Sequence, residues 1–289
     1  MTVWMYVLIG IVALIAMECV REVNTFRMTH YEIKSPKLEG VKQRKIVLLS
    51  DLHNCSYGKN NERLLGAIQK QNPDLILVAG DMLLGSKKKT PKIAEDFMVE
   101  LPKICDVYYA NGNHEQRLKE KEDKPGTSYK AYKELLTNAG VRFLENEKVT
   151  LQWENLDADI YGLELPREAY AKFEWTKLPK HYLVELLGCT NHKNYEILIS
   201  HNPAFMEDYL KWGADLIVSG HLHGGIARIP FWRGIITPQG ELFPKYSGEI
   251  TKVGNQTVVV SKGIGMHTIK LRFLNPLEVV VLHVGGLEE

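Results

Sequence analysis

The sequence predicts an α/β fold in which buried sheets alternate with helices. Short apolar runs rich in β-branched residues and leucine recur along the chain, as is typical of strands that are buried on both faces. Helical patterns lie between these runs, and this alternation favours sheets that are covered by helices. The runs are Ile46–Leu49, Leu75–Val78, Val107–Ala110, Ile197–Ile199, Leu216–Val218, Val258–Val260 and Val279–Leu282.

The segments between the apolar runs carry helix signals. Residues 60–71 place their leucine and isoleucine side chains on one helical face, and Tyr129–Ala139 do the same. Asn202 followed by Pro203 is an N-cap and first-turn pair that opens a predicted helix through Lys211. The sequence shows no clean internal repeat and no sign of a second domain. We therefore expect one domain after the N-terminal region.

The composition excludes some classes of partner. The chain of 289 residues has 45% hydrophobic and 25% charged residues, which is enough apolar material for a sizeable core. A net charge of +1 and the lack of a basic stripe with interleaved aromatics give no reason to expect nucleic acid. The four cysteines lie far apart without a C-x-x-C pair, which predicts reduced thiols.

The N-terminus departs from the globular average. Val3–Met17 is an unbroken apolar stretch that spans roughly 23 Å as a helix, and its flanking residues extend it toward the ~30 Å of a hydrocarbon core. We therefore expect residues 1–20 to be a transmembrane anchor. A cleaved signal peptide is the alternative, but neither a basic n-region nor a small-x-small cleavage site is visible. A buried core helix is less favoured still.

The residues after the apolar stretch suggest an orientation. Residues 21–44 are polar with a Ser-Pro break, which predicts a tether and an edge strand ahead of a domain over residues 45–289. The positive-inside tendency predicts a single-pass membrane protein whose domain faces the cytoplasm. The basic residues concerned are Arg21, Arg27, Lys34, Lys37, Lys42, Arg44 and Lys45.

Polar side chains follow five of the predicted strands, at the point where each strand ends. Ligands of α/β sheets bind beyond the carboxyl ends of strands, so these side chains are expected to converge. A lone histidine at a strand end is more often packed or hydrogen-bonded, but the joint occurrence of all five patterns indicates a site. The residues are Asp51 and His53, Asp81, Asn113 with His114 and Glu115, His201, and His221 with His223.

This donor set predicts a metal centre. Carboxylate, amide oxygen and imidazole suit Mn, Fe or Zn, and the lack of thiolates argues against a structural zinc site. Without a cation, so many buried polar groups would be costly.

The ordered patterns D-x-H, G-D, G-N-H-E, H and G-H-x-H resemble those of the calcineurin-like metallophosphoesterase family over about residues 45–285. The resemblance implies a four-layer α-β-β-α sandwich, with two packed mixed sheets flanked by helices, and two divalent metal ions. It further implies that Asp51, His53 and His223 hold the first metal, that Asn113, His201 and His221 hold the second, and that Asp81 bridges them.

The expected chemistry is phosphate hydrolysis. Two metal ions roughly 3.5–4 Å apart clamp a phosphate and activate a hydroxide for in-line attack on phosphorus. His114, next to the ligand Asn113, is the best-placed proton donor for the leaving group. Glu115 is expected to orient His114 or a ligand through a hydrogen bond.

The C-terminal segments resemble one branch of this family in particular. Residues 223–248 and 258–282 look like a bacterial branch with an N-terminal membrane segment, which includes enzymes similar to UDP-2,3-diacylglucosamine pyrophosphatase. Members often carry glutamine where this chain has Ile226. The apolar residues within 229–243 predict either a lip that contacts acyl chains or the membrane, or a loop that buries them over the sandwich.

The leading hypothesis is therefore a hydrolase of phosphodiester or pyrophosphate bonds, acting on a substrate that is lipid-linked. The segment GDMLLGSKKK has no arginine to clamp a monoester, which makes a phosphomonoesterase the weaker alternative. A non-catalytic scaffold of the same fold is the other alternative, and the complete set of predicted ligands argues against it.

Overall fold

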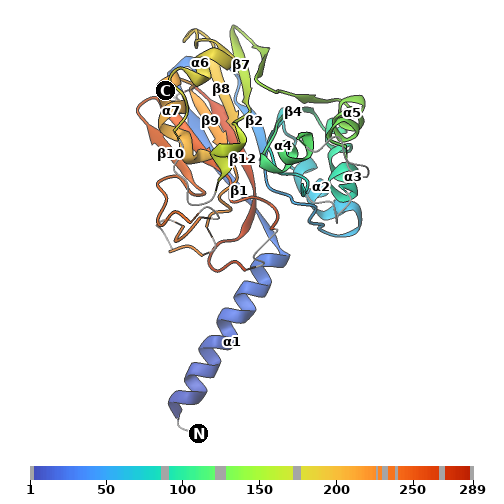
Figure 1. Cartoon of the computed structure of the whole chain (residues 1–289), viewed down its shortest axis with the longest axis vertical. Helices are drawn as coiled ribbons and strands as arrows, with labels where there is room; N and C mark the ends of the chain where they lie inside the picture. Colours follow the sequence, from blue (N-terminus) through green and yellow to red (C-terminus); the bar gives the residue numbers. More distant parts are fainter. Residues whose placement is uncertain are drawn as a thin grey trace.

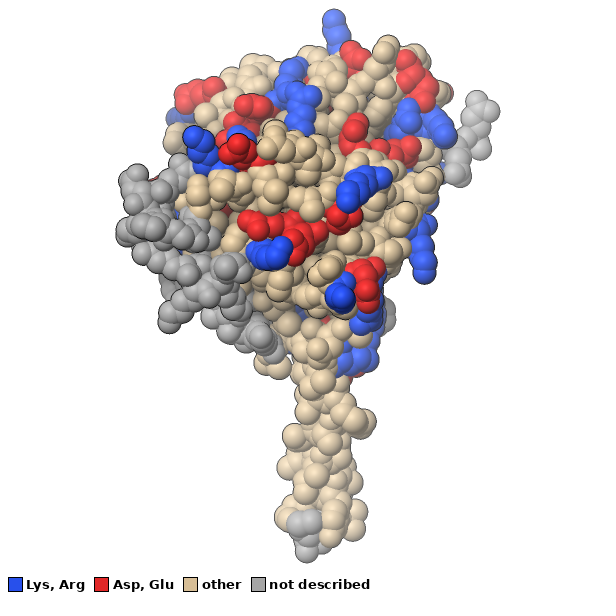
Figure 2. All heavy atoms as spheres, turned by 90° about the vertical axis from the view of Figure 1, so that its right-hand side faces the viewer, with Lys and Arg blue, Asp and Glu red and all other residues tan. Residues whose placement is uncertain are grey.

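The computed structural model of the chain describes residues 3–85, 91–120, 128–171, 177–225, 227–229, 234–237, 240–266 and 271–286. A long helix, α1 (Val3–Asn24), projects from a globular part and leads into its first strand (Figure 1). Its apolar span is fully exposed and is long enough to cross a membrane. Figure 2 shows α1 as a stalk that carries no acidic or basic side chain over most of its length.

Within the described residues the strands form two six-stranded mixed sheets. The first has the order β1 (Phe26–Lys34), β12 (Leu277–Gly285), β2 (Arg44–Leu49), β3 (Leu75–Ala79), β4 (Asp106–Ala110) and β5 (Val141–Phe143). The second has the order β10 (Ile250–Val253), β11 (Gln256–Val260), β9 (Leu216–Ser219), β8 (Tyr195–Ser200), β7 (Leu156–Leu163) and β6 (Glu147–Trp153). Strands β2 to β5 run parallel, and so do β7, β8, β9 and β11.

Helices cover the outer face of each sheet. On the first sheet these are α2 (Glu62–Gln69), α3 (Lys92–Met98), α4 (Asn113–Lys119) and α5 (Tyr129–Ala139), and on the second α6 (Tyr182–Leu187) and α7 (Met206–Trp212) (Figure 1). Short 3-10 segments are Pro36–Leu38, Lys59–Asn61, Leu101–Lys103, Arg167–Tyr170 and Pro203–Phe205. The predicted four-layer sandwich is confirmed.

The alternation of side chains along each strand builds this layering. In β2, Ile46 and Leu48 enter the core between the two sheets, whereas Val47 and Leu49 pack beneath α2 and α3. Both sets are fully buried. A strand with helices on one face and a second sheet on the other needs apolar residues at every position, which explains the continuous apolar runs.

Some strands and one helix start differ from what the sequence predicts. Strand β6 alternates between exposed and buried residues at the edge of its sheet, so it does not read as an apolar run. Strand β7 includes Asp157, Asp159 and Gly162, although most of its residues are buried. The helix expected after Asn202 begins as the 3-10 segment Pro203–Phe205, and the Asn202 side chain accepts a hydrogen bond from Ala204 N (3.0 Å).

We predict that Leu48→Ala lowers the free energy of unfolding by about 2–5 kcal/mol, because it leaves a cavity between the sheets. Leu135→Ala, at an exposed position of α5, is the matched control and should change the free energy of unfolding far less than Leu48→Ala does. Urea denaturation of the detergent-solubilised chain measures both. Equal losses in the two variants would contradict the assignment of the inter-sheet core.

Candidate metal centre

Six of the seven predicted ligands gather in two neighbouring clusters. Asp51, His53 and His223 form the first, and Asp81, His201 and His221 form the second; within each, the candidate ligand atoms lie within 4.8 Å of one another. Asp81 also forms such a group with His53 and His114, so it lies near ligands of both clusters.

Each aspartate divides its two oxygens between the backbone and the histidines. Asp51 Oδ2 accepts a hydrogen bond from His221 N (3.0 Å), while Oδ1 lies 3.5 Å from His53 Nε2 and 3.6 Å from His223 Nε2. Asp81 Oδ1 accepts from His114 N (2.8 Å), while Oδ2 lies 3.1 Å from His201 Nε2. One oxygen therefore fixes each carboxylate, and the other faces imidazoles.

The backbone turns sharply at these positions. A left-handed conformation is uncommon in residues other than glycine and costs of order 1–3 kcal/mol each. Here it directs the side chain sideways as soon as the strand ends, which is where a shared site needs it. The residues are Asp51 (φ 55°), His53 (φ 49°), Asp81 (φ 56°), His221 (φ 70°) and His223 (φ 52°).

Two glycines allow the aspartates to approach. A Cβ atom on Gly112 would lie 2.3 Å from Asp81 Oδ1, and one on Gly220 would lie 2.5 Å from Asp51 Oδ2. Real Cβ atoms do not come this close to an oxygen, so any larger residue would displace the carboxylate. The glycines that precede the predicted ligands are therefore part of the site's geometry.

The unsatisfied polar atoms of this region fit a pair of divalent cations. Among the described residues, Asp51 Oδ1, Asn113 Oδ1 and His221 Nε2 are buried and have no hydrogen-bond partner. Such atoms are costly in a folded protein unless a cation or water meets them. His201 Nδ1 lies 2.5 Å from Ala79 O, which orients the ring with Nε2 toward Asp81, as is common for metal-ligating histidines.

The electrostatics favour positive charge at the centre. Burial by itself raises the pKa of Asp51 and Asp81, but the surrounding histidines hold both pKa values well below the ordinary aspartate range. Burial lowers the pKa of His201, yet the Asp81 carboxylate outweighs it and raises that pKa to about 10. Burial and then His201 lower the pKa of His221 to about 3. Both carboxylates thus stay ionised and attract cations.

His114 presents a defined edge to the site. Its Nδ1 accepts a hydrogen bond from Gly85 N (2.9 Å), so the proton of the neutral ring resides on Nε2. Nε2 lies 3.9 Å from Asp81 Oδ2, and the ring meets that of His53 edge-on, with centroids 4.9 Å apart. The backbone therefore aims an N–H donor at the space beside the two clusters.

Glu115 lies beneath the ligand loops. Its carboxylate accepts hydrogen bonds from Asp81 N (2.8 Å), Gly112 N (3.0 Å) and Tyr109 Oη (2.7 Å). Burial, and then the Asp81 carboxylate, raise the pKa of Glu115 to about 7. The carboxylate ties the end of β3 to the start of α4, so it positions Asp81 through the backbone.

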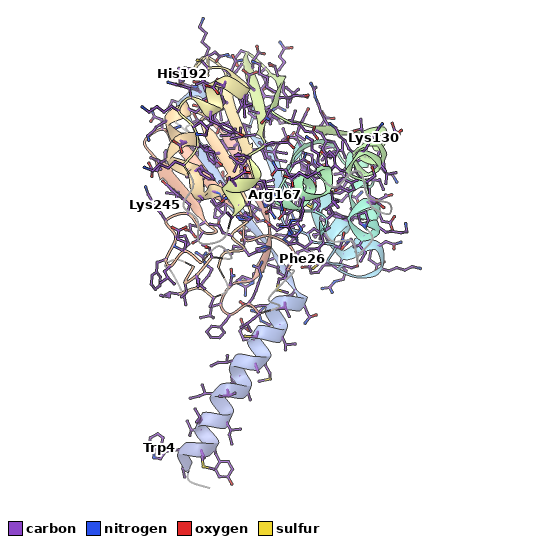
Figure 3. The ribbon with its side chains drawn as sticks, in the orientation of Figure 1. Trp4, Phe26, Lys130, Arg167, His192 and Lys245 are labelled. Atoms are coloured by element: carbon purple, nitrogen blue, oxygen red, sulfur yellow. The ribbon has the colours of Figure 1, made fainter. Side chains whose placement is uncertain are left out.

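A cavity of about 430 Å³ opens beside Asn113. Arg117 and Arg167 line it together with Gln116 and Tyr170. Figure 3 places Arg167 near the middle of the globular part, between the second sheet and α4. Neither arginine was predicted from the sequence, where only the segment after Asp81 was considered for a phosphate-binding arginine. The position of Arg117, one helical turn after His114, was the available signal.

Comparison with known proteins identifies the family. The model of the family described as calcineurin-like phosphoesterase matches residues 44–225. The chain belongs to this family. It is accordingly a metal-dependent phosphoesterase that uses two divalent metal ions. The match includes all nine residues that we predicted for the site.

Three relatives illustrate the range of the family. An uncharacterised metallophosphoesterase of Aquifex aeolicus is 26% identical over 267 residues, covering 92% of this chain and 94% of that protein. A transmembrane protein with metallophosphoesterase domain from Danio rerio is 26% identical, covering 88% of this chain and 56% of that protein. Phosphodiesterase YaeI of Escherichia coli is 24% identical, covering 76% of this chain and 75% of that protein.

We predict that Asp81→Ala abolishes tight metal binding, because it removes the carboxylate that lies near ligands of both clusters. Asp157→Ala, which removes an exposed carboxylate from β7, is the matched control and should keep its metal. Elemental analysis of both purified variants after loading with Mn²⁺ makes the measurement. Full metal content in Asp81→Ala would overturn the bridging role.

The close approach of Gly112 to the Asp81 carboxylate gives a second prediction. Gly112→Ala should weaken Mn²⁺ binding at least tenfold, because its Cβ would displace Asp81 Oδ1. Gly66→Ala, in α2 where a Cβ meets nothing within 4 Å, should leave binding unchanged and stabilise the fold by about 0.5–1 kcal/mol. Calorimetric titration separates the two outcomes, and unchanged affinity in Gly112→Ala would contradict the geometry.

Proposed function

We propose that the chain hydrolyses phosphodiester or pyrophosphate bonds at this centre, on a substrate that is held at a membrane. The observation that carries the proposal is the pair of buried clusters that approach each other through Asp81, with the His114 N–H beside them. The first metal would be held by Asp51, His53 and His223. The second would be held by Asn113, His201 and His221, with Asp81 between them.

The reaction needs a nucleophile and a stabilised leaving group. When bound, two divalent ions polarise a phosphate and lower the pKa of water at the site. His114 Nε2–H would donate a hydrogen bond to the leaving oxygen. Converting the ring to an imidazolium requires giving up the hydrogen bond from Gly85 N, so we assign His114 chiefly to charge stabilisation through this N–H.

The cavity beside Asn113 supports a substrate with a second anionic or polar group. Guanidinium groups bind phosphate oxygens in a bidentate manner, and both Arg117 and Arg167 line this cavity. Arg167 pairs with Glu120 (2.8 Å) at an exposed position, from which it can swing toward a ligand. A diester or a pyrophosphate has such a group beyond the scissile bond. The name of the Escherichia coli relative, phosphodiesterase YaeI, agrees with this assignment.

The position of the exposed apolar side chains supports a substrate at the membrane surface. Loops on either side of β10 and β11 lie at the end of the globular part from which α1 projects (Figure 1). This favours the membrane-contact lip over the buried loop, although Phe231 and Trp232 lie outside the described residues. The exposed apolar residues in these loops are Ile229, Leu242, Phe243, Leu271 and Leu274.

The membrane assignment itself rests on α1. Its exposed apolar span and the transmembrane relative from Danio rerio support a single-pass protein. The basic residues after the apolar span, with Arg21 in the last turn of α1 and Arg27 just beyond the helix, support a cytoplasmic location for the globular part.

A substrate assay tests the proposal. The full chain in detergent with Mn²⁺ should hydrolyse bis(p-nitrophenyl) phosphate at least tenfold faster than p-nitrophenyl phosphate, and a chelator should abolish both activities. A preference for the monoester would contradict the proposed substrate class. No turnover of either substrate by the metal-loaded chain would favour the scaffold.

We predict that His114→Ala lowers kcat by about 10²–10³-fold and leaves the metal content unchanged, because the residue supplies an N–H donor beside the clusters. His192→Ala is the matched control, since this ring is exposed near the far end of the second sheet (Figure 3). Steady-state kinetics together with elemental analysis make the test. Equal kcat values in the two variants would remove His114 from the chemistry.

A further inference from the structure

The last turn of α1 places a buried carboxylate against the globular part. Glu22 is only 1% exposed, whereas the apolar residues before it in α1 are exposed. Its Oε2 accepts a hydrogen bond from Asn275 N (2.9 Å). The base of the apolar helix is thus fastened to the segment that precedes β12, 253 residues further along the chain.

Asn275 links Glu22 to the backbone around His223, a residue of the Asp51–His53–His223 cluster. Its side chain is fully buried, and Nδ2 donates to His223 O (2.8 Å) and to Gly225 O (2.5 Å). A Cβ on Gly224 would lie 2.3 Å from Asn275 Oδ1, so the loop is packed tightly on this side chain. The backbone at His223 is therefore held by a residue that Glu22 holds in turn.

Arg272 holds the imidazole ring of the same ligand. The guanidinium is buried, and its Nη2 donates to Lys262 O (2.7 Å) and lies 3.4 Å from His223 Nδ1. Its Nη1 donates to Asn275 O (3.4 Å). Because Arg272 occupies the Nδ1 side of the ring, the Nε2 side is turned toward Asp51 Oδ1.

Glu22 reaches Arg272 through the backbone of Asn275. The N–H of Asn275 donates to Glu22, and its carbonyl oxygen accepts from Arg272 Nη1. Glu22 therefore supports the position of Arg272 as well as that of Asn275.

We propose that Glu22, through Asn275 and Arg272, is a positioning residue for the Asp51–His53–His223 cluster, so that the base of the apolar helix forms part of the metal centre. The inference rests on the proposed function of these clusters. It implies that metal affinity at the first cluster depends on how α1 is seated. Partners that orient metal ligands typically contribute 10–100-fold in metal affinity.

The test measures metal affinity at each cluster separately, with the full chain in lipid nanodiscs. Mn²⁺ is titrated calorimetrically in two backgrounds, Asn113→Ala and His53→Ala, each of which leaves one cluster complete. In the Asn113→Ala background, Glu22→Ala should weaken Mn²⁺ binding about tenfold. In the His53→Ala background, the same change should alter the affinity of the second cluster by less than threefold.

Three further variants keep the test decisive. Glu22→Gln should restore the first-cluster affinity to within threefold, because an amide oxygen still accepts from Asn275 N. Asn275→Ala breaks the connection at a second point, keeps the backbone N–H, and should reproduce the loss. Glu18→Ala, one turn earlier on α1 where Glu18 pairs with Arg21 (2.6 Å), should have no effect.

The outcomes separate this inference from the proposed function. Unchanged first-cluster affinity in Glu22→Ala, or equal weakening at both clusters, would overturn the positioning role. If the wild-type chain still binds two Mn²⁺ ions and hydrolyses the diester, the proposed function stands without it. A wild-type chain that binds no Mn²⁺ would overturn both proposals.

Discussion

Two carboxylates, those of Asp51 and Asp81, have to be buried side by side without neutralising protons, and the surrounding structure makes this possible. Each carboxylate gives one oxygen to the backbone of a neighbouring loop, His221 N for Asp51 and His114 N for Asp81. The second oxygen faces imidazoles. Ionised groups in such a place need compensating charge, and divalent cations supply it where unpaired donor atoms already converge.

The layered fold serves this arrangement. Strands β2, β3 and β4 of the first sheet and β8 and β9 of the second all end at the site, and the buried apolar residues of these strands keep those ends fixed. Strained backbone at five ligand positions and close-packed glycines at Gly112 and Gly220 then direct the side chains inward. The packing of the two sheets and their helices thus offsets the backbone strain at the ends of these strands.

The sequence predicted those parts of the structure that depend on a local pattern of residue types. Apolar runs predicted the central strands, and polar residues at their ends predicted the candidate ligands of the two clusters that the structure brings together. The edge strand β6 was missed because it is polar on one face. Glu115 was expected to orient His114 or a ligand through a hydrogen bond. Its carboxylate accepts one from the backbone N–H of Asp81, a contact that no side-chain pattern reveals. The contact between Glu22 and Asn275 joins residues 253 positions apart and has no local signal.

Two cations, one on each side of Asp81, are the central requirement of this site. Anomalous scattering from crystals of the full chain grown with Mn²⁺ tests this claim without reference to any substrate. We expect two anomalous peaks, one among Asp51, His53 and His223 and the other among Asn113, His201 and His221. An absence of peaks at these residues under Mn²⁺-replete conditions, or peaks only elsewhere, would contradict it.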